Sequence, residues 1–204
     1  MSKRTPSPIT GLTRGNELSA LCAEPLTILI DIDGTLAIWL RSFDRLMLRL
    51  DPNVAILNTD DYNVFNRYNS DPRIIQAALD MEGFYADLEP MPGAIDAVAE
   101  MRADGHDVVF LSMPTATNPT CASDKYRWVE RHFGTDMVAR TTLAFDKTRV
   151  HGSVLLDDKP SVTGAVTPSW QHILFDAEYN RHVTDRARLT HWAEWRKVLV
   201  GVNA

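Results

Sequence analysis

Short apolar runs recur along the chain, and stretches with helical spacing lie between them. The runs predict buried β-strands at residues 26–30, 107–111, 153–156 and 172–175. Apolar residues at helical spacing predict helices at residues 93–103, 125–132 and 189–199. Strands that alternate with helices are typical of a parallel sheet, so the pattern predicts an α/β fold.

One segment, residues 37–90, departs from this alternation. It carries helical patterns at residues 38–50, 60–68 and 73–81 and contains no convincing buried strand. The pairs Asp51-Pro52 and Asp71-Pro72 separate these patterns. We therefore expect a small helical subdomain, inserted after the first strand and lying over the carboxyl ends of the strands as a lid does.

The whole chain then divides into three parts. Residues 1–24 are rich in Pro, Ser, Thr and Gly and predict a flexible tail with a short helix near residues 18–22. Residues 25–36 and 91–204 form the expected α/β core, and residues 37–90 form the expected cap. The tail has no continuous apolar stretch, so we expect no signal peptide.

Composition narrows the class of protein. A chain of 204 residues that is 45% hydrophobic is long enough to bury a core as one domain. Its net charge of −6 argues against a broad face for long nucleic acid. Cys22 and Cys121 fit no metal or disulfide spacing, and no stretch is apolar enough to span a membrane. We therefore expect a cytoplasmic protein.

The most informative residues follow the first predicted strand, where Asp31 and Asp33 precede Gly34. Residues at i and i+2 of a strand share a face, and two neighbouring carboxylates raise each other's pKa unless a cation lies between them. The pair therefore indicates a metal ion, a shared proton, or both.

A calcium loop would need glycine and glutamate where Leu36 and Ser42 stand, so that alternative fails. A polar turn without function remains a competing interpretation of the pair alone. A nucleophile with a general acid/base is the functional interpretation.

Further polar residues border the other strands. Asp157 and Asp158 end the strand at 153–156, and parallel strands bring their carboxyl ends to one edge of the sheet. An all-oxygen set of this kind selects Mg²⁺ over Zn²⁺. Ser112 follows a second strand and is placed to hold a phosphate oxygen, and Lys147 is placed to neutralise charge. Each of these residues, taken alone, is more often structural.

Together these residues resemble a known signature. Asp31-Ile-Asp-Gly-Thr, Ser112, Lys147 and Asp157-Asp158 occur in the order of the four motifs of the haloacid dehalogenase superfamily of phosphohydrolases. Further segments resemble the 5'(3')-deoxyribonucleotidases within it, namely residues 83–94, 125–130, 146–148, 155–160 and 167–170. The similarity runs from about residue 26 to residue 199 and is weakest in residues 40–80. It implies a Rossmann-like core with a helical cap.

The resemblance implies a role for each site residue. It makes Asp31 the nucleophile and Asp33 the general acid/base, whose backbone carbonyl also binds Mg²⁺. Asp158 is the expected direct metal ligand, and Asp157 supports it. The remaining residues are expected around the substrate, with Ser112, Lys147 and Gly34 at the phosphate and Trp39 and Phe65 at the nucleoside. Relatives also imply a homodimer.

Two departures from the family concern phosphate binding, because Met113 stands where a serine is usual and Phe145 where close relatives have arginine. The expected function is Mg²⁺-dependent hydrolysis of a nucleoside monophosphate through an aspartyl phosphate. The alternatives are a polynucleotide 3'-phosphatase, a small-metabolite phosphatase, or a non-catalytic nucleotide-binding protein. Asp33 argues against a dehalogenase, and Asp33 alone does not separate a phosphatase from a phosphomutase.

Overall fold

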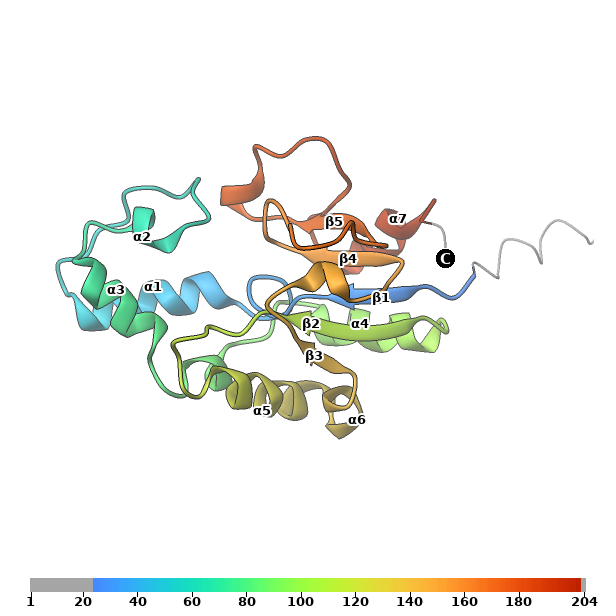
Figure 1. Cartoon of the computed structure of the whole chain (residues 1–204), viewed down its shortest axis with the longest axis horizontal. Helices are drawn as coiled ribbons and strands as arrows, with labels where there is room; N and C mark the ends of the chain where they lie inside the picture. Colours follow the sequence, from blue (N-terminus) through green and yellow to red (C-terminus); the bar gives the residue numbers. More distant parts are fainter. Residues whose placement is uncertain (1–23, 203–204) are drawn as a thin grey trace, which may run out of the picture.

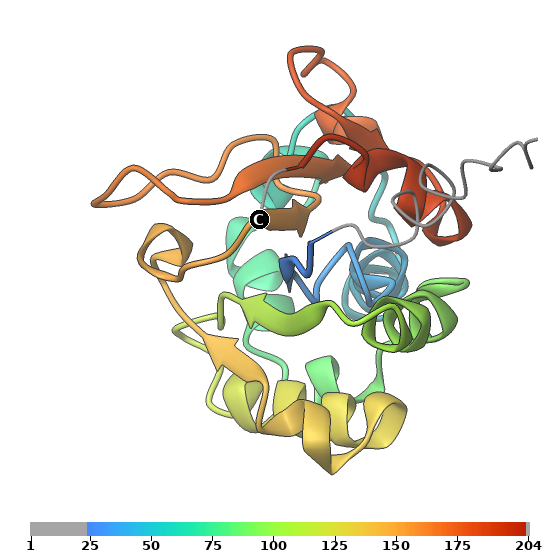
Figure 2. The same cartoon turned by 90° about the vertical axis from the view of Figure 1, so that its right-hand side faces the viewer.

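A six-stranded sheet forms the centre of the molecule. The computed structural model describes residues 24–202. The strand order is β3-β2-β1-β4-β5-β6, and every neighbouring pair is parallel (Figures 1 and 2). The strands are β1 Thr27–Ile30, β2 Asp107–Ser112, β3 Thr141–Leu143, β4 Val154–Asp157, β5 Gln171–Phe175 and β6 Arg188–Leu189. The predicted α/β fold with a parallel sheet is confirmed.

The four apolar runs became the four inner strands, and both outer strands were missed. β3 and β6 have three and two residues, and they contain Thr141, Thr142 and Arg188. A short edge strand with one solvated face has no apolar run for a pattern to detect. The helix predicted at residues 189–199 was wrong in its first half. There the chain forms β6 and a 3₁₀ turn, and the helix α7 covers only Trp195–Leu199.

The two faces of the sheet are covered differently. Helices α4 (Ala94–Ala103) and α5 (Cys121–Phe133) pack with the C-terminal segment on the face that contains Ile28 and Ile30. The opposite face, which contains Leu29, is covered by Trp170 and by loop residues. A short helix α6 (Thr135–Val138) connects α5 to β3. β1 lies in the middle of this core, where all of Ile28, Leu29 and Ile30 are fully buried.

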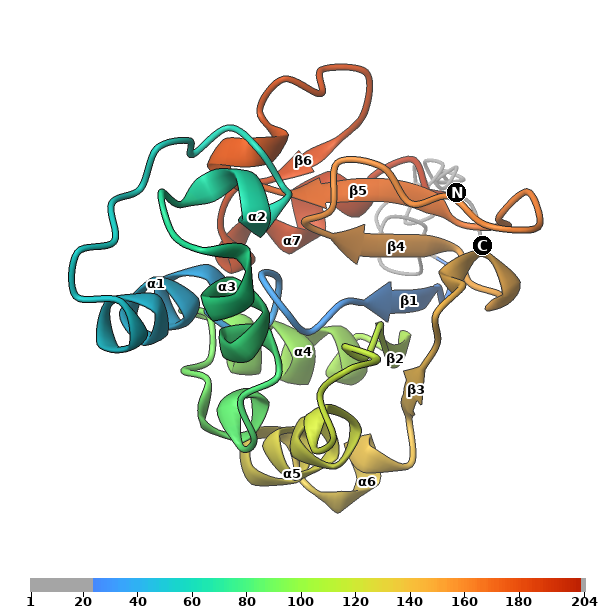
Figure 3. The same ribbon diagram turned by 60° about the vertical axis from the view of Figure 1, so that its left-hand side comes forward.

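Residues 37–90, which we call the cap segment, lie beyond the carboxyl ends of the strands (Figures 1 and 3). They form α1 (Trp39–Leu50), α2 (Val64–Arg67), α3 (Pro72–Leu79) and a 3₁₀ turn, η1 (Phe84–Asp87). Helix α2 is shorter than predicted, because residues 60–63 form turns in which Asp61 and Asn63 accept backbone hydrogen bonds.

The cap segment has its own apolar cluster, built from Phe43, Leu46, Met47, Tyr68, Ile75 and Ala78. Ala37 and Pro90 form an antiparallel bridge at the two ends of the cap segment. Tyr85 and Leu88, near its second end, pack into the main core. The amide of Ile38 donates to the carbonyl of Glu89 at 2.8 Å. The outgoing and returning chains therefore run side by side as a two-stranded connection.

Two sequence expectations fall partly or wholly outside the described residues. The tail at residues 1–24 lies almost wholly outside them, and its short helix and Cys22 lie wholly outside. Within residues 24–202, Cys121 is a free, buried thiol, and no helix is long and apolar enough to cross a membrane.

Candidate active site

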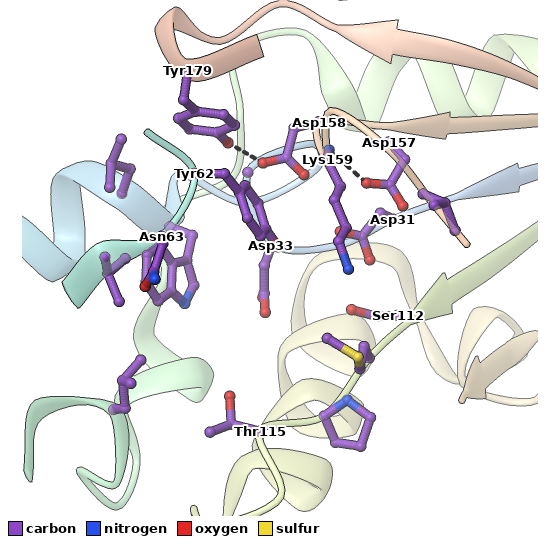
Figure 4. Close-up of a pocket in the computed structure, with 18 of the residues that line it drawn as sticks. Asp31, Asp33, Tyr62, Asn63, Ser112, Thr115, Asp157, Asp158, Lys159 and Tyr179 are labelled. Atoms are coloured by element: carbon purple, nitrogen blue, oxygen red, sulfur yellow. Dashed lines mark hydrogen bonds between the residues drawn. The ribbon is translucent and has the colours of Figure 1, made fainter. Parts of the chain in front are cut away.

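The ends of β1 and β4 bring three buried carboxylates together. Asp31 directly follows β1, Asp157 is the last residue of β4, and Asp158 follows it. Because β1 and β4 are neighbouring parallel strands, their acidic ends meet at the same edge of the sheet. One carboxylate oxygen from each of the three lies within 4.8 Å of the others. Figure 4 shows the three side chains gathered at this edge, with Ser112 across the space from them.

Lys147 lies between two of these acids. It is the first residue of a 3₁₀ turn, η2 (Lys147–Arg149), and its Nζ is 2.8 Å from Asp31 Oδ1 and 2.6 Å from Asp157 Oδ2. Burial by itself would lower the pKa of Lys147, but the charges of Asp31 and Asp157 outweigh it and raise the pKa. Lys147 is therefore a permanent cation beside Asp31.

Asp158 is fixed by contacts on several sides. The Tyr179 hydroxyl donates to its Oδ2, and the Thr35 hydroxyl lies 3.4 Å from its Oδ1. Gly34, at φ +77°, lets the loop pass directly under this carboxylate, because a Cβ there would lie 2.6 Å from Asp158 Cγ. Burial, together with the neighbouring Asp157 and Asp31 charges, raises the pKa of Asp158 well above its usual range.

The three carboxylates fit a metal ion. Lys147 provides one positive charge against three acids, so the group keeps an excess of negative charge in a buried place. Such a group is stable when a further cation neutralises it. All donors are carboxylate oxygens, which are the ligands of hard divalent cations.

The Asp33 side chain turns away from this cluster toward the end of β2. Its Oδ2 accepts from Lys125 Nζ at 2.5 Å, and the same ammonium donates to Ser112 Oγ at 2.8 Å. Burial raises the pKa of the Asp33 carboxyl, and the Lys125 charge opposes this rise. Asp33 Oδ1 is buried and has no hydrogen-bond partner among the described residues. One oxygen of Asp33 is thus held by Lys125, and the other has no partner among the described residues.

A cavity of about 560 Å³ contains this chemistry. The core residues Asp31, Asp33, Ser112 and Lys147 line one side, and the cap segment lines the other. Trp39 faces the cavity and stacks on Phe43, with ring centres 4.6 Å apart. Phe65 also lines it and is 38% exposed. The cavity therefore combines a polar end, where the acids and Lys147 meet, with an aromatic end that suits a flat ring.

The two departures from the family pattern lie at the same cavity. Phe145 and Met113 both line it, and their side chains are 67% and 41% exposed. Neither side chain can donate a hydrogen bond to a phosphate oxygen. Lys159 lines the same cavity and extends into it in Figure 4, so it adds a cation to the cavity.

Comparison with known proteins shows which family this chain belongs to. A sequence profile described as 5' nucleotidase, deoxy (pyrimidine), cytosolic type C matches residues 25–204. The chain belongs to this family. A relative from Bordetella pertussis, whose name refers it to the 5'(3')-deoxyribonucleotidases, is 41% identical over 180 residues, which are 86% of this chain and 96% of the relative. The cytosolic-type 5'(3')-deoxyribonucleotidase of Homo sapiens is 38% identical over 192 residues, which are 87% of this chain and 94% of that protein.

Solved structures agree on the fold of this nucleotidase family member. A haloacid dehalogenase family hydrolase of Deinococcus radiodurans, crystallised with phosphate and sodium, superposes with a TM-score of 0.57 at 13% identity. The match covers 86% of this chain and 95% of that one. A haloacid dehalogenase-like hydrolase of Xanthomonas campestris gives a TM-score of 0.51 at 14% identity, covering 89% and 97%. As a member of its family, the chain is a phosphoric monoester hydrolase.

The structure also reveals site residues that sequence reasoning missed. Lys125 was noticed as part of a family segment, and its contact with Asp33 was not anticipated. A signal existed, because Lys125 shares one face of α5 with the buried Cys121, Trp128 and Val129. A lysine on an apolar helix face needs a charged partner inside the protein. Tyr179 had no such signal, because it lies in a short turn far along the chain from Asp158.

Proposed function

We propose that this protein hydrolyses deoxynucleoside monophosphates to deoxynucleosides and phosphate, with Asp31 as the nucleophile and Mg²⁺ as the metal. The observation that carries the proposal is that one cavity contains the carboxylate cluster of Asp31, Asp157 and Asp158 together with Asp33, whose Oδ1 has no hydrogen-bond partner among the described residues. The names of the family's relatives support the deoxynucleotide as substrate.

Asp31 begins the reaction. Its carboxylate attacks the phosphorus, and the bond from phosphorus to the nucleoside oxygen breaks. Lys147, 2.8 Å from Asp31 Oδ1, pairs with the carboxylate and attracts the phosphoryl oxygens. Ser112 and Gly34 border the place that the phosphoryl group would occupy, and the Ser112 hydroxyl is our proposed donor to it.

Asp33 moves the protons. We assign to its carboxyl, whose pKa burial raises, the proton that the departing nucleoside oxygen takes up. The resulting carboxylate then takes a proton from water, which attacks the phosphorus of the aspartyl phosphate and releases phosphate and free Asp31. Lys125 holds Asp33 Oδ2 throughout, so the unpartnered Oδ1 is the atom that exchanges the proton.

Asp31, Asp157 and Asp158 would hold the Mg²⁺, together with the backbone carbonyl of Asp33. When bound, the ion withdraws charge from the phosphoryl oxygens and lets the anionic nucleophile approach an anionic ester. We assign Asp158 as the direct ligand and Asp157 as its support, because Lys147 donates to Asp157 Oδ2 and the Lys159 backbone amide donates to Asp157 Oδ1.

Residues 37–90 act as the cap in this proposal, and Trp39 and Phe65 border the nucleoside. Trp39 supports this role because its ring is held in place by Phe43 and faces the cavity. An aromatic surface stacks on a base without reading its edge, so Trp39 can accept either a pyrimidine or a purine.

A substrate panel tests the activity. Phosphate release is measured with Mg²⁺ from the 5' and 3' deoxynucleoside monophosphates, from UMP, from a sugar phosphate and from an oligonucleotide with a 3'-phosphate. We expect the deoxynucleoside monophosphates to be hydrolysed with the highest kcat/KM. Release that is fastest from the sugar phosphate or the oligonucleotide would instead support one of the other phosphatase classes.

We also propose a cytoplasmic location and a homodimer, with no binding to long nucleic acid. The name of the human cytosolic relative supports the location, and the net charge of −6 supports the last point. Cell fractionation and light scattering of the purified protein test the first two.

A further inference from the structure

The turn that follows β5 holds Asp158 at two points. This turn is η3 (Glu178–Asn180), and its residues Tyr179 and Asn180 both contact Asp158. The Tyr179 hydroxyl donates to Asp158 Oδ2. The Asn180 side-chain amide donates to the Asp158 carbonyl at 2.7 Å and to the Phe175 carbonyl at 2.7 Å. The turn therefore fixes both the backbone and the carboxylate of Asp158.

The turn itself is anchored to the sheet. Arg188 of β6 donates to the Asn180 side-chain oxygen and, at 3.0 Å, to the Asn180 carbonyl. It also forms an ion pair with Asp176 at 3.0 Å. Asn180 is fully buried, and Tyr179 is 7% exposed. Because these groups are buried and paired, the Tyr179 hydroxyl has little freedom to leave Asp158.

The ring of Tyr179 contacts the cap segment on its other side. Tyr62, in the loop before α2, packs edge-on against it, with ring centres 5.5 Å apart and planes at 71°. Lys159, which directly follows Asp158, places its Nζ 5.8 Å from the centre of the Tyr62 ring. Figure 4 shows Tyr62, Tyr179 and Asp158 close together at this side of the cavity. A continuous set of contacts thus links the cap segment to the carboxylate.

We propose that Tyr179 is a positioning residue for the metal ion, and that Tyr62 of the cap segment supports it, so that metal affinity depends on the contact between cap and core. This inference rests on the metal site of the proposed function, and it assigns to Tyr179 a task that the motifs do not include. The Tyr179 hydroxyl fixes Oδ2 of Asp158, so that the carboxylate keeps one orientation beside Asp31 and Asp157. Without it, repulsion from Asp157 and Asp31 would turn the Asp158 carboxylate away from the cluster.

Calorimetric titration of the full-length protein with Mg²⁺ alone tests the inference. Tyr179→Phe keeps the ring and removes the hydroxyl, and we expect its Kd for Mg²⁺ to rise by about 10- to 100-fold. Tyr126→Phe is the matched control, because Tyr126 lies on α5 outside the cavity, and its Kd should not change. Melting curves in EDTA establish that both variants are folded. A Tyr179→Phe variant that binds Mg²⁺ like the wild type, or a wild type that binds none, would overturn the proposal.

A second variant tests the support from the cap. Tyr62→Ala should weaken Mg²⁺ binding several-fold in the wild-type background and not further in the Tyr179→Phe background, because both act through one hydroxyl. If Tyr62→Ala weakens Mg²⁺ binding equally in both backgrounds, Tyr62 does not act through the Tyr179 hydroxyl. Activity assays distinguish weaker metal binding from a damaged catalytic step. Only if metal binding alone is weakened should a higher Mg²⁺ concentration restore the kcat of Tyr179→Phe. If Mg²⁺ binding responds as expected while no nucleotide is hydrolysed, the proposed function fails and the inference stands.

Discussion

A substitution at Gly34 tests whether the loop after β1 controls the position of Asp158 in the carboxylate cluster of Asp31, Asp157 and Asp158. Gly34 has a φ of +77°, and an added Cβ would lie 2.6 Å from Asp158 Cγ. Ordinary carbon contacts are about 3.5–4.0 Å, so Gly34→Ala would displace the Asp158 carboxyl by about 1 Å. The substitution therefore combines two effects, which are backbone strain and loss of the Asp158 position.

Gly83 separates these effects. Its φ is +79°, nearly that of Gly34, and an added Cβ there would meet nothing within 4 Å. Gly83→Ala therefore carries only the strain of the left-handed conformation, about 1–2 kcal/mol of unfolding free energy. Gly34→Ala should show a similar strain and, in addition, a Mg²⁺ affinity about 10- to 100-fold weaker, since misplacing a supported ligand has effects of this size. That loss corresponds to about 1.4–3 kcal/mol of binding free energy.

Two measurements on both variants give the result. Urea denaturation in EDTA reports the strain, and calorimetric titration with Mg²⁺ reports the ligand position. We expect both variants to lose stability and Gly34→Ala alone to lose affinity. If Gly34→Ala binds Mg²⁺ as tightly as Gly83→Ala, Asp158 does not hold the metal in the way that we describe.

Three further predictions concern charge. Lys147→Met leaves buried carboxylates unpaired, so the unfolding free energy should fall by about 3–5 kcal/mol. Burial already raises the pKa of Asp157, and removing the Lys147 charge raises it further. The folded state then binds more protons than the unfolded state, so urea melts should show a larger loss at pH 8 than at pH 5. Burial and Arg186 lower the pKa of His172 to about 4 from 6.5, so the unfolded chain binds the extra proton between these values and stability falls as pH falls. His172→Gln should reduce this fall by at most about 3 kcal/mol, and unchanged melts from pH 7 to 4 would contradict the assignment. Mg²⁺ at 100 times its Kd should stabilise the wild type by about 2.7 kcal/mol in thermal melts, and Asp158→Asn should remove this gain.

Much of the fold could be predicted from the sequence, because the inner strands depend on the local pattern of apolar residues. The inner strands are buried on both faces, and a buried parallel strand requires a continuous apolar run. Strand ends then place Asp31, Ser112 and Asp157 without further knowledge, since parallel strands end at one edge. The edge strands β3 and β6 escaped because two or three half-exposed residues leave no periodicity to detect.

The residues that hold the site's carboxylates in place were harder to predict, because they contact the carboxylates from distant segments of the chain. Lys125 reaches Asp33 across 92 positions of the chain, and Tyr179 reaches Asp158 across 21. The contact of Tyr62 with Tyr179 requires knowing how the cap segment lies over the core, and that segment is also where the family resemblance is weakest. Local pattern thus indicates the groups that we propose to react, and tertiary structure determines which residues hold them in place.

The central claim is that Asp31 is the nucleophile of a Mg²⁺-dependent phosphatase for deoxynucleoside monophosphates. Phosphate release from dUMP, measured in parallel for the wild type and Asp31→Asn at saturating Mg²⁺, tests it most directly. We predict release by the wild type and a kcat at least about a thousandfold lower for Asp31→Asn, with both proteins folded by their melting curves. An Asp31→Asn variant that turns over at the wild-type rate, or a wild type that releases no phosphate from any deoxynucleotide, would contradict the account.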